Sequence, residues 1–129
     1  MNSIIGIGTD VVQIPRIEKI YAKFGEKFLY KNYHELEIKI FSELSQKQKI
    51  LFLAKRFAAK EAISKALGFG IGKLGFKDIA IINNEIGAPF VRIFGESGIA
   101  PNNYNDYKIH ISVSDDYPIA LAFAVVERI

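Results

Sequence analysis

The chain has 129 residues, half of them hydrophobic, with no cysteine and a formal net charge of +3 at pH 7. This length predicts one globular domain over residues 1–129, and the lack of cysteine excludes disulfides and thiolate metal sites. Neither a secretory pattern nor an apolar run of roughly 18–20 residues is present, so we expect a cytoplasmic protein without a membrane segment.

Positive charge is concentrated in one part of the chain. Residues 51–75 contain five Lys or Arg side chains and a single acidic one, Glu61. A local basic patch favours phosphate groups or an acidic protein partner, whereas the modest overall charge argues against general binding of nucleic acid. A solvated helix face is the alternative interpretation.

The first predicted element is a strand at Ser3–Val12. Glycines inside a strand, here Gly6 and Gly8, often mark the close approach of another backbone or a ligand. Asp10 falls near the end of this strand, where site residues are commonly displayed. A turn or a helix cap is the alternative role for Asp10.

Helices are predicted next. Pro15 suits the first turn of an amphipathic helix that Gly25 ends. One or two short helices are expected over residues 26–44, with His34 at the surface and without a second metal ligand nearby. Ser45 and Gln48 then match a capping box at the start of a longer helix.

This longer helix should run to about Leu67 and contains Glu61. Residues four apart share a helix face, so Glu61 lies in one row with Leu53, Phe57 and Lys65. A carboxylate removed from water is normally protonated, paired or bound to a metal. A weak surface pair between Glu61 and Lys65 is the simpler interpretation.

Glycines follow the long helix at Gly68, Gly70, Gly72 and Gly75. Gly68 is the expected helix stop, and exposed amides of such a loop can cradle an anion. The loop lacks the Gly-Lys-Ser/Thr sequence of a phosphate-binding P-loop, so it is a weak signal alone.

The rest of the chain is predicted to form strands, and His110 lies in one of them. Ile109, Ile111 and Val113 should face the core while His110 faces the other way. The final strand is apolar throughout and should be central. The predicted strands are Lys77–Asn83, Pro89–Phe94, Tyr107–Ser114 and Ile119–Glu127, with a loop at 95–106. The expected fold is α+β, a mixed or mainly antiparallel sheet packed around the long central helix.

Three stretches together resemble one enzyme family, the holo-acyl-carrier-protein synthases of the 4′-phosphopantetheinyl transferase superfamily. The resemblance spans nearly the whole chain in the right order, and the central motif is the most specific. The three stretches are Gly8-Thr9-Asp10 with Arg16, Arg56-Phe57-Ala58-Ala59-Lys60-Glu61-Ala62 with Lys65, and His110-Ile111-Ser112.

The resemblance implies Mg²⁺-dependent transfer of 4′-phosphopantetheine from coenzyme A to a serine of apo acyl carrier protein, with release of adenosine 3′,5′-bisphosphate. It also implies a role in fatty acid biosynthesis and a homotrimer with active sites at subunit boundaries. The family's metal-binding acids fall on Asp10 and Glu61, its phosphate-contacting lysine on Lys65 and its histidine on His110. Asp115 occupies a position where some relatives carry a second histidine.

Coenzyme A carries phosphates that suit a cationic site, so the residues expected to bind it are Arg56, Lys60, Lys65, Gly68, Gly70, Gly72 and His110. Mg²⁺ prefers oxygen ligands and often takes one or two protein carboxylates plus substrate phosphates. The residues expected to be catalytic are Glu61, Lys65 and His110. Our hypothesis is that Glu61, directly or through a metal-bound water, takes the serine proton while His110 binds phosphate; the opposite assignment stays open.

Two further functions use the same residues. A non-catalytic binding module would need Lys65 and the glycine loop but not the two acids. A magnesium-dependent phosphohydrolase would use the acids with water as the nucleophile. Arg56 and its neighbouring lysines, or Arg16 and Lys19, could also steer an acidic carrier protein toward the site.

Overall fold

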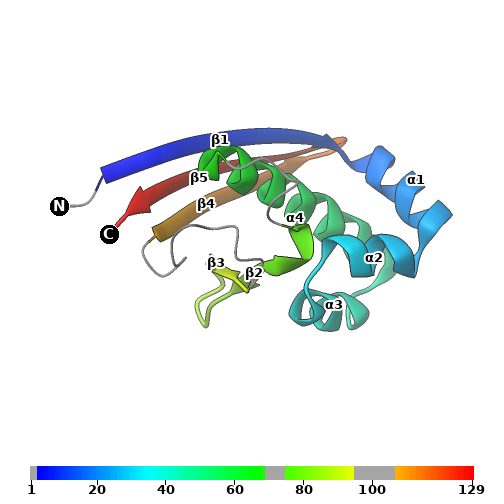
Figure 1. Cartoon of the computed structure of the whole chain (residues 1–129). Coiled ribbons are helices and arrows are strands. Elements are labelled where there is room, and N and C mark those ends of the chain that lie inside the picture. The colour runs from blue at the N-terminus through cyan, green and yellow to red at the C-terminus, as the bar shows by residue number, and fades with distance from the viewer. Residues whose placement is uncertain (1–2, 69–74, 95–106) are drawn as a thin grey trace.

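A computed structural model describes residues 3–68, 75–94 and 107–129 of the chain (Figure 1). The predicted α+β class is confirmed. Its elements are β1 (Ser3–Gln13), α1 (Ile14–Phe24), α2 (Glu26–Asn32), α3 (Glu35–Ser42), α4 (Gln46–Leu67), the 3₁₀ turn η1 (Phe76–Asp78), β2 (Ile79–Asn83), β3 (Pro89–Ile93), β4 (Tyr107–Asp116) and β5 (Ile119–Arg128).

Two antiparallel sheets form in the described part of the chain. The larger has the strand order β1-β5-β4, and the smaller is the β2-β3 hairpin. The prediction that the last strand is central is therefore confirmed for the larger sheet. Its register aligns Asp10 with Ala122, and Ala122 with Val113, so these three residues share one face.

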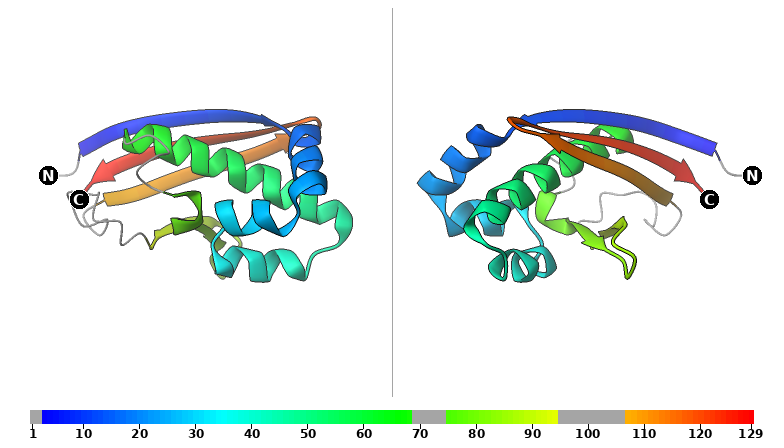
Figure 2. Two further views of the ribbon diagram at one scale, coloured as in Figure 1. Left: turned by 45° about the vertical axis from the view of Figure 1, so that its right-hand side comes forward. Right: turned by 180° about the vertical axis from the view of Figure 1, so that it is seen from behind.

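Helix α4 covers that face of the larger sheet (Figures 1 and 2). The contact uses very small residues: Gly6 and Gly8 on β1 approach the carbonyl oxygens of Ala66 and Ala62. The facing alanines of β5 and α4 are almost completely buried, and they include Ala120, Ala122, Ala124, Ala58, Ala59 and Ala62. Small side chains thus bring the helix close to β1.

The ends of α4 follow from its sequence. Ser45 Oγ accepts the Gln48 N–H, and the Gln48 side chain accepts the Ser45 N–H, which completes the predicted capping box. Gly68 ends the helix in the left-handed conformation with φ +76°, which glycine adopts without a Cβ clash. Both boundaries agree with the prediction.

Three shorter helices gather at one end of α4 (Figure 2). The predicted segment 26–44 contains two helices, separated at Tyr33 and His34. His34 is only partly exposed, and its side chain is held in place by two contacts. Its Nδ1 accepts the Leu36 N–H at 3.1 Å, and its ring stacks on Phe94. It caps α3.

The strand expected from Lys77 begins later, at Ile79. Phe76–Asp78 instead forms a 3₁₀ turn, in which the Asp78 N–H bonds to the Gly75 carbonyl. The Phe76 ring packs edge-on against Phe57 of α4. The turn thus coincides with a contact to a distant element that no local pattern indicates. No helix of the described residues is both long and apolar enough to cross a membrane.

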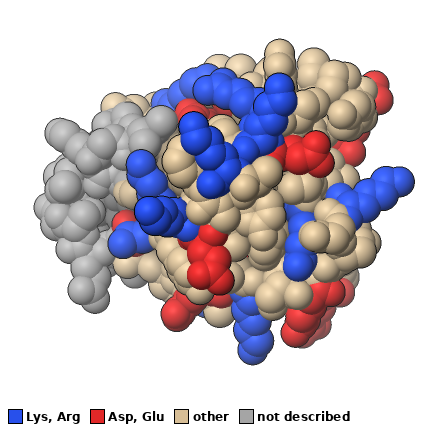
Figure 3. Space-filling model, turned by 90° about the vertical axis from the view of Figure 1, so that its right-hand side faces the viewer, with Lys and Arg blue, Asp and Glu red and all other residues tan. Residues whose placement is uncertain are grey.

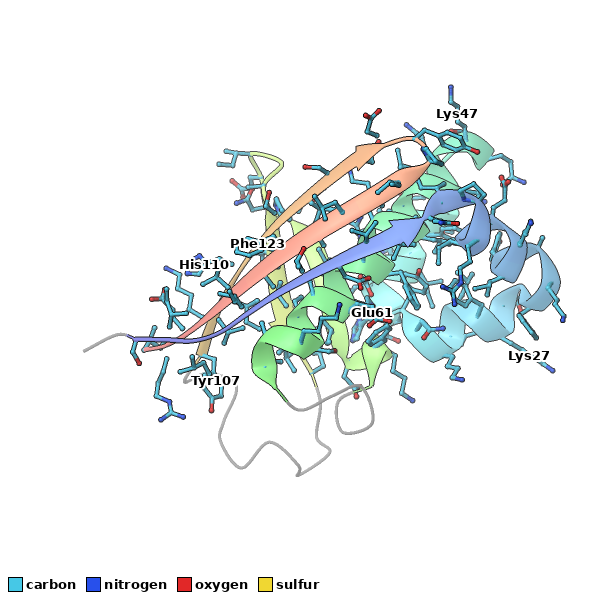
Figure 4. All side chains as sticks on the ribbon, turned by 90° about the horizontal axis from the view of Figure 1, so that it is seen from above. Lys27, Lys47, Glu61, Tyr107, His110 and Phe123 are labelled. Carbon is cyan, nitrogen blue, oxygen red and sulfur yellow. The ribbon has the colours of Figure 1, made fainter. Side chains whose placement is uncertain are left out.

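None of the described helices or strands covers the other face of the larger sheet. On β1 and β5 its side chains are mainly apolar and exposed, and Phe123 at the centre of the sheet is 44% exposed. On β4 they are polar and include His110, Ser112 and Ser114. Viewed from above, this face carries Phe123 and His110, whereas Glu61 lies on α4 beyond the edge formed by β1 (Figure 4). The exposed apolar residues of this face include Ile7, Val11, Ile119, Leu121 and Phe123.

Candidate active site

A cavity of about 500 Å³ opens between the end of β1, helix α1 and helix α4. Its charged lining residues are Asp10, Arg16, Glu61 and Lys65. The remaining walls come from Val11, Val12, Gln13, Ile17, Ile20 and Phe57. Four residues that the sequence marked as site candidates thus share one cavity.

The two acids reach this cavity from different elements. Asp10 lies on the face of β1 that packs on α4, as its pairing with the buried Ala122 shows. Glu61 projects from the middle of α4 and forms no hydrogen bond or ion pair with the described residues. Burial raises the pKa of Glu61, the nearby Asp10 raises it further, and Lys65 and Arg16 oppose this shift.

Lys65 pairs with Asp10. Its Nζ lies 3.1 Å from Asp10 Oδ1 and 2.9 Å from the carbonyl oxygen of Thr9. The surface pair between Lys65 and Glu61, considered as the simpler interpretation, is therefore not formed among the described residues. Lys65 brings a cation to the metal-ligand candidates.

Arg16 supplies the second cation of the cavity. It enters from the first turns of α1, only six residues after Asp10, and forms no hydrogen bond with the described residues. Its charge acts on Glu61, where it opposes the rise in pKa that burial causes. An unpaired guanidinium beside a cavity is suited to a phosphate group.

The donor set fits Mg²⁺ shared with a substrate. The described residues contain no group of three or more His, Cys, Asp or Glu side chains able to hold a metal. Two carboxylates converge instead, and one of them, Glu61, has no hydrogen-bond or ion-pair partner among the described residues. Mg²⁺ commonly takes one or two carboxylates and completes its shell with water and phosphate oxygens, so Asp10 and Glu61 fit such an ion.

Lys60 corrects one of our expectations, because it does not reach the cavity. Its side chain is 0% exposed, and Nζ donates to Glu37 Oε1 and to the carbonyl oxygens of Asn32 and Phe76. All three ammonium protons are therefore used inside the protein. Burial lowers the pKa of Lys60 to about 8, against the opposing effect of Glu37. Lys60 joins α4 to its neighbours, and its ammonium has no free proton to offer a ligand in this geometry.

Glu37 is the residue that sequence reasoning missed. It is fully buried and also accepts the N–H groups of His34 and Ile81. The available signal was its spacing of three residues after His34, the spacing of a capping box. Nothing in that pattern indicates that the same carboxylate is the buried partner of Lys60.

Arg56 also points away from the cavity of Asp10 and Glu61. Its Nε donates to the Ile81 carbonyl at 3.2 Å, and its guanidinium stacks over the Phe52 ring. It borders a separate cavity of about 260 Å³ that includes Asn83 and Pro89 in its lining. Any contact between Arg56 and a ligand would take place there.

His110 lies on the opposite face of the larger sheet from Asp10. It pairs with Val125 in β4-β5 and alternates with Ile109 and Ile111, which pack toward α4. Its Nε2 lies 2.8 Å from Glu127 Oε1 on the open face. One chain therefore does not bring His110 together with Glu61, as Figure 4 shows.

Of the glycines expected to bind coenzyme A, Gly68 is the helix stop described above. Gly70 and Gly72 lie outside the described residues.

Comparison with known proteins identifies the family. Residues 6–122 match the family model described as the 4′-phosphopantetheinyl transferase superfamily. A holo-[acyl-carrier-protein] synthase of Orientia tsutsugamushi (strain Ikeda) is 48% identical over 126 residues, which cover 95% of this chain and 96% of that protein.

Solved structures agree. A holo-(acyl-carrier-protein) synthase of Bacillus anthracis in complex with coenzyme A (3′,5′-ADP) is 35% identical, with a TM-score of 0.82 and 98% of each chain covered. The Helicobacter pylori enzyme in complex with coenzyme A is 37% identical, with a TM-score of 0.78, 93% of this chain and 98% of that chain covered. The chain belongs to the 4′-phosphopantetheinyl transferase superfamily and is an enzyme of its holo-[acyl-carrier-protein] synthase group.

Proposed function

We propose that this enzyme transfers 4′-phosphopantetheine from coenzyme A to a serine of apo acyl carrier protein, with Mg²⁺ as cofactor and adenosine 3′,5′-bisphosphate as the second product. The observation that carries the proposal is the cavity that Glu61 shares with Asp10, Arg16 and Lys65, where Glu61 forms no hydrogen bond or ion pair with any other described residue. The Bacillus anthracis and Helicobacter pylori relatives bind coenzyme A, which supports coenzyme A as the donor.

Asp10 and Glu61 are the residues that would hold Mg²⁺. When bound, the ion neutralises charge on the phosphate oxygens during transfer. Lys65 and Arg16 then face the same phosphates as hydrogen-bond donors. Such positioning and electrostatic stabilisation account for most of catalysis in phosphoryl-group transfer.

The transfer forms one bond and breaks another at the phosphorus nearer to pantetheine. The serine Oγ bonds to this phosphorus, and the bond to the bridging pyrophosphate oxygen breaks with its electron pair leaving on adenosine 3′,5′-bisphosphate. The serine proton passes to Glu61. Glu61 is the proposed base because its carboxylate faces the cavity without a hydrogen-bond partner among the described residues. His110 is the alternative base.

The open face of the larger sheet supports a homotrimer with shared active sites. Its exposed apolar side chains, such as Phe123 and Leu121, form a patch of the kind that protein partners cover. His110 lies on this same face and cannot meet Glu61 of its own chain. In the proposed assembly, His110 of one copy faces the cavity of the next.

The acyl carrier protein is proposed to dock at the end formed by α1 and α2. Figure 3 shows Lys and Arg side chains distributed over this end among Asp and Glu side chains. Arg16 and Lys19 on α1 lie nearest in sequence to the cavity-lining strand end. Acidic carrier proteins should associate more slowly as salt concentration rises, and a KM that is independent of salt would count against this docking.

The deciding experiment is intact-mass spectrometry of an apo acyl carrier protein incubated with this enzyme, coenzyme A and Mg²⁺. We expect a mass increase of one phosphopantetheine group, lost in Asp10→Ala and Glu61→Gln. Retained coenzyme A binding without modification of several carrier proteins would favour a binding module. Release of adenosine 3′,5′-bisphosphate in the absence of carrier protein would favour hydrolysis.

A further inference from the structure

The position of Lys65 has a consequence for metal binding. Its ammonium contacts Asp10 Oδ1 and the Thr9 carbonyl oxygen, at 3.1 and 2.9 Å. Asp10 is the less exposed partner, with 17% of its side chain in contact with solvent against 54% for Lys65. The lysine thus neutralises an acid that the active site also offers to a divalent ion.

Lys65 is the only lysine among the described residues that line the cavity. More than half of its side chain is exposed, and both of its acceptors lie on β1 rather than on its own helix. A lysine side chain is long and flexible, so its ammonium can leave one acceptor for another at little cost. Arg16, the other cation of the cavity, forms no hydrogen bond with Asp10 in the described structure.

Two cations cannot use the same carboxylate equally well. A divalent ion at Asp10 and Glu61 would lie within a few ångströms of the Lys65 ammonium, where like charges repel. A phosphate group beside Lys65 offers the ammonium another anionic partner. Binding of phosphate and binding of the ion would therefore favour each other, and this coupling must be reciprocal.

We propose that Lys65 competes with the divalent cation for Asp10, and that the phosphates of coenzyme A relieve this competition by drawing Lys65 away. The identity of the phosphate ligand rests on the proposed function. Lys65 then has two roles of opposite sign: it weakens binding of the ion alone and strengthens binding of coenzyme A.

The test measures Mn²⁺ binding by the amplitude of the free-ion electron paramagnetic resonance signal, first without coenzyme A. Lys65→Met removes the charge and keeps most of the length, so we expect Mn²⁺ to bind about two- to fivefold more tightly, the range typical of partly exposed ion pairs. Lys65→Arg should keep the wild-type affinity. Unchanged or weaker Mn²⁺ binding by Lys65→Met would overturn the proposal.

A matched control removes an equivalent lysine elsewhere on α4. Lys55 also lies 3.1 Å from an aspartate, Asp115, but away from the cavity. Lys55→Met should leave the affinity for Mn²⁺ unchanged, and an equal gain in both variants would reduce the effect to net charge and overturn the proposal. In an Asp10→Asn background, Lys65→Met should not increase the affinity for Mn²⁺, because the carboxylate for which the two cations compete has been removed.

The same substitution should have the opposite effect on the affinity for coenzyme A. Lys65→Met should weaken it about tenfold, the loss expected for one charge-assisted hydrogen bond. Weaker coenzyme A binding without tighter Mn²⁺ binding would reject the competition and keep the proposed function. Absence of coenzyme A binding by the wild-type enzyme would reject the proposed function, while tighter Mn²⁺ binding by Lys65→Met would still support competition for Asp10.

Discussion

Gly8 of β1 lies in direct backbone contact with Ala62 of α4: a Cβ atom on Gly8 would fall 2.0 Å from the Ala62 carbonyl oxygen. Both groups are main chain, so no change of rotamer relieves the clash. The strand and the helix therefore approach without a side chain between them. Asp10 follows two residues after Gly8, and Glu61 directly precedes Ala62, so this contact determines the separation of the two acids.

Gly8→Ala should consequently destabilise the protein and impair the site together. Overpacking at such a contact lowers the free energy of unfolding by roughly 1–3 kcal/mol, which urea unfolding can measure. The Mg²⁺ concentration needed for half-maximal activity should also rise. Gly75→Ala is the control, because Gly75 has an ordinary φ of −66° and its added Cβ would meet only side-chain atoms, at 3.3 Å or more. Equal stability of the two variants would contradict the backbone contact.

Lys60→Met should be costly for stability and neutral for coenzyme A binding. It leaves the Glu37 carboxylate buried without its ammonium partner, a change that typically costs about 3–5 kcal/mol. Combining Lys60→Met with Glu37→Gln should recover part of this loss in a double-mutant cycle. Reduced coenzyme A affinity in a Lys60→Met protein of wild-type stability would show that Lys60 does act in the site.

Complementation between inactive subunits tests the shared active site. His110→Ala and Glu61→Gln should each have low activity, but equal mixtures refolded together should regain activity at about one quarter of the sites. Those sites combine Glu61 of one copy with His110 of another.

Mixing Asp10→Ala with Glu61→Gln is the control. Both residues line the same cavity of one chain, so no combination of these two variants restores a site. Equal recovery in both mixtures would argue against an active site divided between subunits.

Glu61→Gln should make the protein more stable in the absence of divalent ions, and the gain should depend on pH. Burial raises the pKa of Glu61, so the folded protein binds the proton more tightly than the unfolded chain. The stability that protonation contributes is complete below the unfolded pKa, about 4.3 for glutamate, and is lost as pH rises through the higher folded pKa.

The stability advantage of Glu61→Gln over wild type should therefore grow from pH 4 toward neutrality in unfolding experiments with a chelator. Addition of Mg²⁺ should stabilise only the wild type, because ligands stabilise the state that binds them. Activity of Glu61→Gln should fall at least about 100-fold, as expected when a general base is lost. A constant stability difference across this pH range would contradict the raised pKa.

Local signals predicted the helices of this protein well. The ends of α1 and α4 depend on Pro15, Gly25, Ser45 and Gly68, which act within their own turns. The pairing of β1 with β5 joins residues as far apart as Ser3 and Arg128, and no local pattern encodes it. The 3₁₀ turn at Phe76–Asp78 was missed for the same reason, because Phe76 responds to Phe57 of a distant element.

The sequence also indicated the residues of the cavity, Asp10, Arg16, Glu61 and Lys65, through their motifs. The sequence did not predict which faces of α4 carry the other cations. In the sequence, Lys60 and Arg56 look like Lys65, since all three are cations of the same basic helix. In the structure, however, Lys60 is fully buried in an ion pair with Glu37. Deciding which lysine faces a ligand requires the position of a carboxylate 23 residues away.

Two adjacent residues of α4 lie in different environments. Lys60 lies in the protein interior, while Glu61, about 100° further around the helix, faces the cavity. A single inserted residue between Gln46 and Lys60, with the start of the helix held by Ser45, would rotate the second half of α4 by that angle. The ammonium would swing out of its pocket and Glu61 would leave the cavity. The length of α4 between Gln46 and Lys60 therefore fixes which side chain faces the interior and which faces the cavity.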